Sequence, residues 1–162
     1  MIDRMTSFVS KALLGLAAVC LLLMLFQVTL DVVLRFFFKW TVIGTLETVS
    51  FYYMVGLVFL SFAFVELRHQ NVRVDLFVQL MPPTLQLWLY VASCLFGLAF
   101  FGMLGWQTFQ DAMRATARGE TAMANFVFPI WPARWALPFG FLGLCLALLS
   151  NMIKALREAR PL

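Results

Sequence analysis

Four stretches of this sequence are long enough to cross a lipid bilayer and contain no charged residue. At 1.5 Å per helical residue, residues 12–30 reach about 28 Å, close to the thickness of the hydrocarbon core. The third and longest run is divided near its start by Pro82-Pro83, because proline cannot continue a regular helix. The pattern therefore predicts an all-α integral membrane protein, with a single membrane domain over residues 1–162 and spans at about 12–34, 48–66, 84–110 and 135–153.

The composition supports this class. Hydrophobic residues make up 63% of the 162 residues and charged residues only 12%, which is far from the balance of a soluble domain. The net charge of +4 does not indicate nucleic acid, since the basic residues are spread over tails and loops instead of forming a stripe. Contact with the anionic surface of the membrane explains them better. Membrane lipids are thus expected contacts, and nucleic acid is not.

The distribution of lysine and arginine predicts the orientation. The side of the membrane that carries more lysine and arginine is expected to be the cytoplasmic side, because basic loops are retained in the cytoplasm. Both termini lie on that side. That side has Arg4, Lys11, Arg68, Arg73, Lys154, Arg157 and Arg160, whereas the other has Arg35, Lys39, Arg114, Arg118 and Arg134.

Candidate chemical sites are scarce. Cys20, Cys94 and Cys145 fall inside predicted helices without CxxC spacing and are interpreted as packing residues. A haem between helices normally needs two histidines, and the sequence has only His69. An ion-coupled carrier needs a charged residue near mid-membrane, which these spans lack. We therefore expect no catalytic, cofactor, metal, substrate or sodium site, and nothing supports an enzyme.

Charged residues gather at the ends of the spans. Asp31 and Arg35 are four residues apart, so they share a helical face and can pair near the headgroups. The pair either neutralises its charges locally or, with Lys39 and Glu47 across the short loop, forms a docking surface for a partner outside the membrane.

The second loop has the densest polar pattern, and its candidate interface residues are Glu66, Arg68, His69, Arg73 and Asp75. Glu66 and Arg68 are expected where the second span leaves the bilayer, and His69 is interpreted as a surface hydrogen-bonding residue. The apolar spacing that follows predicts a short amphipathic helix over 71–81 at the interface. A similar spacing predicts that residues 2–12 also lie along the interface before the chain turns into the bilayer.

Several motifs together resemble one known family, the DctQ-like small membrane subunits of tripartite ATP-independent periplasmic (TRAP) transporters. Arg35-Phe36 ends the first span and Gly44-Thr45-Leu46-Glu47 opens the second; Glu66-x-Arg68-His69 and Val72-x-Val74-Asp75 follow it, and Leu137-Pro138-Phe139-Gly140 opens the last. The likeness covers nearly the whole chain.

This resemblance implies a heteromeric, sodium-driven importer of organic anions, such as carboxylates or sugar acids, in the bacterial inner membrane. A periplasmic binding protein would capture the solute and deliver it to a large multi-span permease subunit of the elevator type, which would hold the sodium and substrate sites. The small subunit would act as a scaffold for that subunit and help to dock the binding protein. Such a role agrees with the uncharged spans.

The third loop is a second candidate for contact with the binding protein. Asp111, Arg114 and Arg118 recur at i, i+3 and i+7, so the third helix is expected to extend past the bilayer until Gly119 stops it. Residues 120–134 would then return along the outer interface. A merely solvated loop is the alternative.

Small residues at four-residue spacing, Ser93 with Gly97 and Gly143 with Ala147, predict close helix contacts, unless the glycines are only incidental. Two other functions stay open at this point: a small oligomeric exporter and a membrane anchor subunit of a redox complex.

Overall fold

A computed structural model describes residues 2–40, 44–68, 81–123 and 127–158, and confirms an all-α membrane protein. Four helices are long and apolar enough to cross a membrane: Thr6–Phe38, Thr45–Leu67, Thr84–Arg118 and Trp131–Arg157. Each contains one of the predicted spans. The predicted amphipathic helix over 71–81 falls almost wholly outside the described residues.

The first span is α1, Ile2–Phe38. The second span consists of three helical pieces in direct succession: α2 (Thr45–Thr48), the π-helical turn η1 (Val49–Tyr53) and α3 (Met54–Leu67). The third is α4, Pro83–Arg118. A small hairpin of β1, Thr121–Met123, and β2, Val127–Pro129, leads to the short helix α5, Trp131–Arg134, and then to the final helix α6, Ala136–Glu158.

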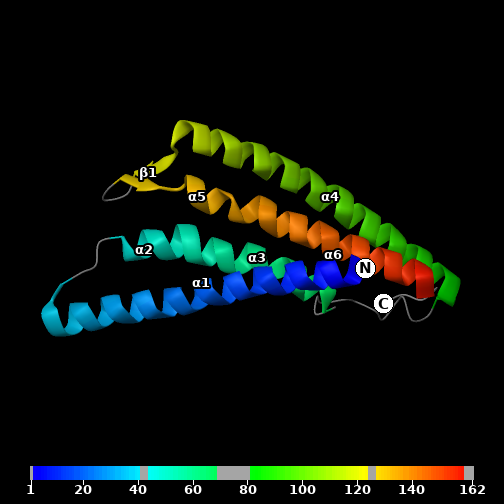
Figure 1. Cartoon of the computed structure of the whole chain (residues 1–162), viewed down its shortest axis with the longest axis horizontal. Helices are drawn as coiled ribbons and strands as arrows, with labels where there is room; N and C mark the ends of the chain where they lie inside the picture. The colour runs from blue at the N-terminus through cyan, green and yellow to red at the C-terminus, as the bar shows by residue number, and fades with distance from the viewer. Residues whose placement is uncertain (1, 41–43, 69–80, 124–126, 159–162) are drawn as a thin grey trace.

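Helix α6 is the centre of the molecule. It packs against α1 and α3 on one side and against α4 on the other, so that the helices form an open layer (Figure 1). Its buried residues Leu144, Ala147, Leu148, Asn151 and Ala155 recur at helical spacing and form the core with their neighbours. Most of the remaining helix surface is apolar and exposed, as expected for a protein surrounded by lipid or by another membrane subunit.

Two glycines allow α6 to approach its neighbours closely. A Cβ atom at Gly140 would collide with the carbonyl group of Phe59 on α3, lying only 2.7 Å from the carbonyl carbon. A Cβ atom at Gly143 would lie 2.6 Å from Leu13 Cδ1 and 3.1 Å from Ala63 Cβ. The predicted close contact at Gly143 is therefore present, whereas Ser93 is exposed and its hydroxyl donates to the carbonyl of Tyr90.

The N-terminal segment differs from the prediction. Instead of an interfacial helix followed by a turn, α1 is one continuous helix from Ile2 to Phe38. Its polar face near the start is buried, with Thr6 and Ser10 on the same side as Ala17. Because that face packs on protein, the segment forms one continuous helix with the first span.

The ends of α4 follow the prediction. Pro82 is its N-cap and Pro83 its first residue, a position where the missing backbone N–H of proline costs little. Gly119 ends it with φ 59° and ψ 45°, a left-handed conformation that glycine adopts without a steric penalty. Arg118 is thus the last helical residue, well beyond the predicted span.

Candidate functional site

The predicted site residues that the structure describes lie at the two ends of the helix layer. At the hairpin end, α1 and α4 finish, α2 and α6 begin, and β1 and β2 connect α4 to α5 (Figure 1). At the terminal end, α1 begins and α3 and α6 finish. The long helices between the ends expose mostly apolar side chains.

The Asp31–Arg35 ion pair is present at the hairpin end. Arg35 Nη2 donates to Asp31 Oδ2 over 2.9 Å, as the four-residue spacing predicts. Asp31 is buried while most of the Arg35 side chain is exposed, so the guanidinium group shields the carboxylate and still faces outward. The pair therefore presents the Arg35 guanidinium group at the surface, held in place by the buried Asp31 carboxylate.

Lys39 and Glu47 lie at the same end of the layer as this pair, at the end of α1 and the start of α2. Lys39 follows α1 directly, is exposed, and has a positive φ of 52°. Glu47 is half-buried in the first turn of the second span, where a carboxylate interacts favourably with the helix N-terminus. This turn begins at Gly44, whose φ of 93° is left-handed and whose carbonyl accepts a hydrogen bond from Thr48 Oγ1.

The second charged group of the hairpin end lies on α4. Asp111 Oδ1 and Arg114 Nη1 are 3.6 Å apart, and Arg114 also donates to Gln110. With Trp106 and other residues of the same helix, both line a shallow surface cavity of about 270 Å³. Arg118 is exposed one turn further along.

These two charged groups do not form one site. Asp31 and Arg35 belong to α1, and Asp111, Arg114 and Arg118 belong to α4, which lies on the opposite side of α6 (Figure 1). Any partner that contacted both groups would have to cover the whole hairpin end.

The third loop contains a β-hairpin, which the sequence did not predict. Thr121 pairs with Pro129 and Met123 with Val127 in antiparallel register. The hairpin is tied to the second span, since Tyr52 Oη donates to the Pro129 carbonyl over 2.6 Å. Phe128 packs against the rings of Phe51 and Tyr52. This loop is thus a shaped surface joined to the rest of the hairpin end.

Two further contacts brace the base of the hairpin. Arg134 pairs with Glu120 across the loop, and Trp135 Nε1 donates to Thr116 Oγ1 over 3.1 Å. They connect the end of α4 to the start of the last span.

Glu66 lies at the end of the second span, as predicted, and its side chain is buried against α6. There Asn151 Nδ2 donates to Glu66 Oε1 over 3.1 Å and to the Glu66 carbonyl over 3.3 Å. The carboxylate therefore helps to join α3 to α6.

Asn151 is the functional residue that the sequence reasoning missed. It is fully buried and lies beside the buried Ser150. A Ser-Asn pair inside an otherwise apolar span was the signal that could have revealed it, since polar side chains in such helices commonly hydrogen-bond between helices.

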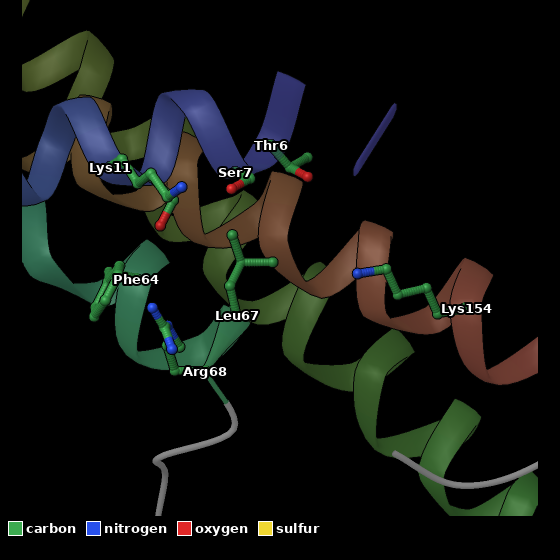
Figure 2. Close-up of a pocket in the computed structure, with 8 residues that line it drawn as sticks. Thr6, Ser7, Lys11, Phe64, Leu67, Arg68 and Lys154 are labelled. Carbon is green, nitrogen blue, oxygen red and sulfur yellow. The ribbon is translucent and has the colours of Figure 1, made fainter. Parts of the chain in front are cut away.

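The other candidates of the second loop are at the terminal end or outside the described residues. Arg68 is exposed directly after α3, and its guanidinium carbon lies 5.2 Å from the centre of the Phe64 ring (Figure 2). His69, Arg73 and Asp75 lie outside the described residues.

Broad apolar faces on α1 and α4 point away from α6. On α4 the exposed stripe includes Phe96, Phe100, Met103 and Trp106, and on α1 it includes Phe26. Exposed apolar patches of this extent mark contact with lipid or with a partner.

Within the described ranges, no group of three or more histidine, cysteine, aspartate or glutamate side chains is placed to hold a metal ion. The three cysteines are free thiols.

Comparison with known proteins gives one match. A family model described as "Tripartite ATP-independent periplasmic transporters, DctQ component" matches residues 24–158. No curated protein and no solved structure gives a significant match to the chain.

Proposed function

The chain belongs to the DctQ family of tripartite ATP-independent periplasmic transporters, and we propose that it is the small permease subunit of a sodium-driven importer of organic anions. Carboxylates or sugar acids are the substrates expected for the complex. The partners would be a large multi-span permease subunit of the elevator type and a periplasmic binding protein. In this proposal the chain forms a single membrane domain and has no substrate or sodium site of its own.

The proposed role of the chain is that of a scaffold. The observation that carries it is the open helix layer, in which α1 and α4 present apolar faces on opposite sides of a central α6. The uncharged runs provide no mid-membrane group that could bind an ion. Such a layer can broaden the static part of a larger carrier and give its moving part a surface to slide against.

The charged residues at the hairpin end are the proposed contacts with partners outside the hydrocarbon region, namely the binding protein and the headgroup-level surface of the large permease subunit. They are Asp31, Arg35, Lys39, Glu47, Asp111, Arg114 and Arg118. The braced β-hairpin supports this assignment, because a shaped loop on rigid helices can position a docking surface. Arg68 at the terminal end is a further proposed contact, as are His69, Arg73 and Asp75, which follow it in the sequence.

The proposed location is the bacterial inner membrane, with both termini in the cytoplasm. The bias of basic residues toward the terminal side supports this orientation. A fluorescent protein that folds only in the cytoplasm should fluoresce when it is fused to the C-terminus. A fusion that is present at normal levels but does not fluoresce would show that the C-terminus lies outside the cytoplasm.

Co-purification tests the interface. The chain should be co-expressed with the large permease subunit, and the amount of large subunit recovered on a tag of the small one should be measured. Replacing Asp31 and Arg35 together by alanine is expected to lower recovery about tenfold, because a desolvated charged contact is lost.

Matched variants, each with its melting temperature measured, separate docking from folding. Arg35→Gln removes only the exposed cation, and Arg157→Gln removes an exposed cation from the terminal end. Recovery should fall with Arg35→Gln and stay normal with Arg157→Gln. Unchanged recovery with both the double variant and Arg35→Gln would contradict the docking role of this pair, while failure of the native chain to recover any large subunit would contradict the proposed function.

A further inference from the structure

Three cations from three different helices meet at a cavity of about 230 Å³ at the terminal end. Lys11 comes from α1, Arg68 follows α3, and Lys154 comes from α6 (Figure 2). Figure 2 shows the amino groups of both lysines directed toward the space between the helices. Cationic side chains that line one cavity make its electrostatic potential positive, which favours an anionic ligand.

The wall of this cavity also contains a buried hydroxyl group. Ser10 is only 2% exposed, lines the cavity, and its Oγ has no hydrogen-bond partner among the described residues. A buried polar group without a partner is costly, so such a group usually indicates a ligand or a water. Ser7 adds a second hydroxyl to the wall one turn earlier. Hydroxyl and ammonium donors together suit the oxygens of a phosphate group.

The position of the three cations indicates the source of that phosphate. Lys11 directly precedes the uncharged run 12–30, Lys154 directly follows the uncharged run 135–153, and Arg68 comes three residues after the uncharged run 48–65. All three therefore lie where the hydrocarbon region gives way to headgroups. Phe64 and Leu67 supply apolar surface to the same cavity, beside which an acyl chain can begin.

We propose that this cavity binds the phosphate of an anionic phospholipid, with the lipid's acyl chains running along the apolar helix surface. The lysines and the arginine neutralise the headgroup, and Ser10 and Ser7 donate hydrogen bonds to its oxygens. A lipid held in this way connects the ends of α1, α3 and α6.

Native mass spectrometry of the full-length chain tests the site. The protein should be offered an equimolar mixture of phosphatidylglycerol and phosphatidylcholine, and the ratio of the two retained lipids measured. We expect the native chain to favour phosphatidylglycerol and the double variant Lys11→Gln/Lys154→Gln to lose about tenfold or more of that preference. Arg157→Gln is the matched control, since Arg157 is an exposed cation on the same helix, outside the cavity.

A second variant tests the hydroxyl. Ser10→Ala should weaken retention of phosphatidylglycerol while the lipid-free protein melts at the same or a higher temperature, because an unpartnered buried group is removed.

Three outcomes would overturn the proposal: equal retention of the two lipids by the native chain, an unchanged preference in the double lysine variant, or an equal loss of preference in Arg157→Gln. Competition with inorganic phosphate distinguishes a lipid headgroup from a soluble phosphate as the ligand. Displacement of the lipid by phosphate at equal concentration would overturn the assignment to a lipid and indicate a soluble phosphate ligand instead.

Discussion

A buried amide and a buried carboxylate connect the second and fourth spans of this protein. The side chain of Asn151 is enclosed between helices and donates to both the side chain and the backbone of Glu66. In a membrane, where water cannot replace a lost partner, each such group must be satisfied within the protein. The pair therefore fixes how α3 and α6 are aligned at the terminal end.

Removing one member of this pair should destabilise the protein more than removing both. We expect Asn151→Leu to cost about 1–3 kcal/mol, since it leaves the buried Glu66 carboxylate without its amide donor. The double variant Asn151→Leu/Glu66→Leu should recover much of that loss, because apolar replacement of a buried polar pair is often tolerated.

The melting temperatures of the native chain, the single variant and the double variant in detergent measure these changes in stability. A decrease of about 3–8 °C is expected for Asn151→Leu. Equal melting temperatures for the native chain and Asn151→Leu would show that the hydrogen bonds contribute nothing to stability.

At the scale of the elements, helix packing depends on glycines of α6. Gly140 and Gly143 lie on the face turned toward α1 and α3, and their lack of a side chain sets the distance between the backbones. The π-helical turn η1 at the start of the second span carries Phe51 and Tyr52, which hold the hairpin. Close packing on one side of α6 and an anchored loop at one end together give the layer its rigidity.

Gly140→Ala is expected to destabilise the protein by about 3 kcal/mol, because the new methyl group would meet the backbone carbonyl of Phe59, which cannot move alone. Gly102→Ala is the matched control: Gly102 is also helical, and a Cβ atom there would have nothing within 4 Å. The control should be neutral or stabilising by up to about 1 kcal/mol. Thermal unfolding of both variants in the same detergent distinguishes them, and equal melting temperatures would contradict the packing account.

The spans were predictable because a long uncharged, apolar run can form few stable structures other than a membrane-spanning helix. The ends of α4 were predictable because the backbone geometry of Pro82 and Gly119 does not continue a helix. The hairpin was not predictable, because its strands are three residues long and too short to show a period. Its anchor is Tyr52, which is 77 residues away from Pro129 in the sequence.

The candidate site was predictable only in part, for a related reason. The Asp31–Arg35 and Asp111–Arg114 pairs depend on helical spacing, which the sequence shows directly. The burial of Glu66 depends on Asn151, which comes from a different helix, and no local pattern indicates that contact.

At the scale of the whole molecule, the helices form an open layer and not a closed bundle. Helix α3 packs between α1 and α6, and α6 packs between α3 and α4, so the outer faces of α1 and α4 remain exposed and apolar (Figure 1). This open layer is the observation on which the proposed scaffold role rests.

Transport in reconstituted vesicles tests this account most directly. Vesicles should be prepared with this chain alone, with the large permease subunit alone, and with both, and each should receive the binding protein, a labelled organic anion and a sodium gradient. We expect uptake only when both membrane subunits are present. Uptake by vesicles that contain this chain without the large subunit, driven by the imposed gradient, would contradict the scaffold role.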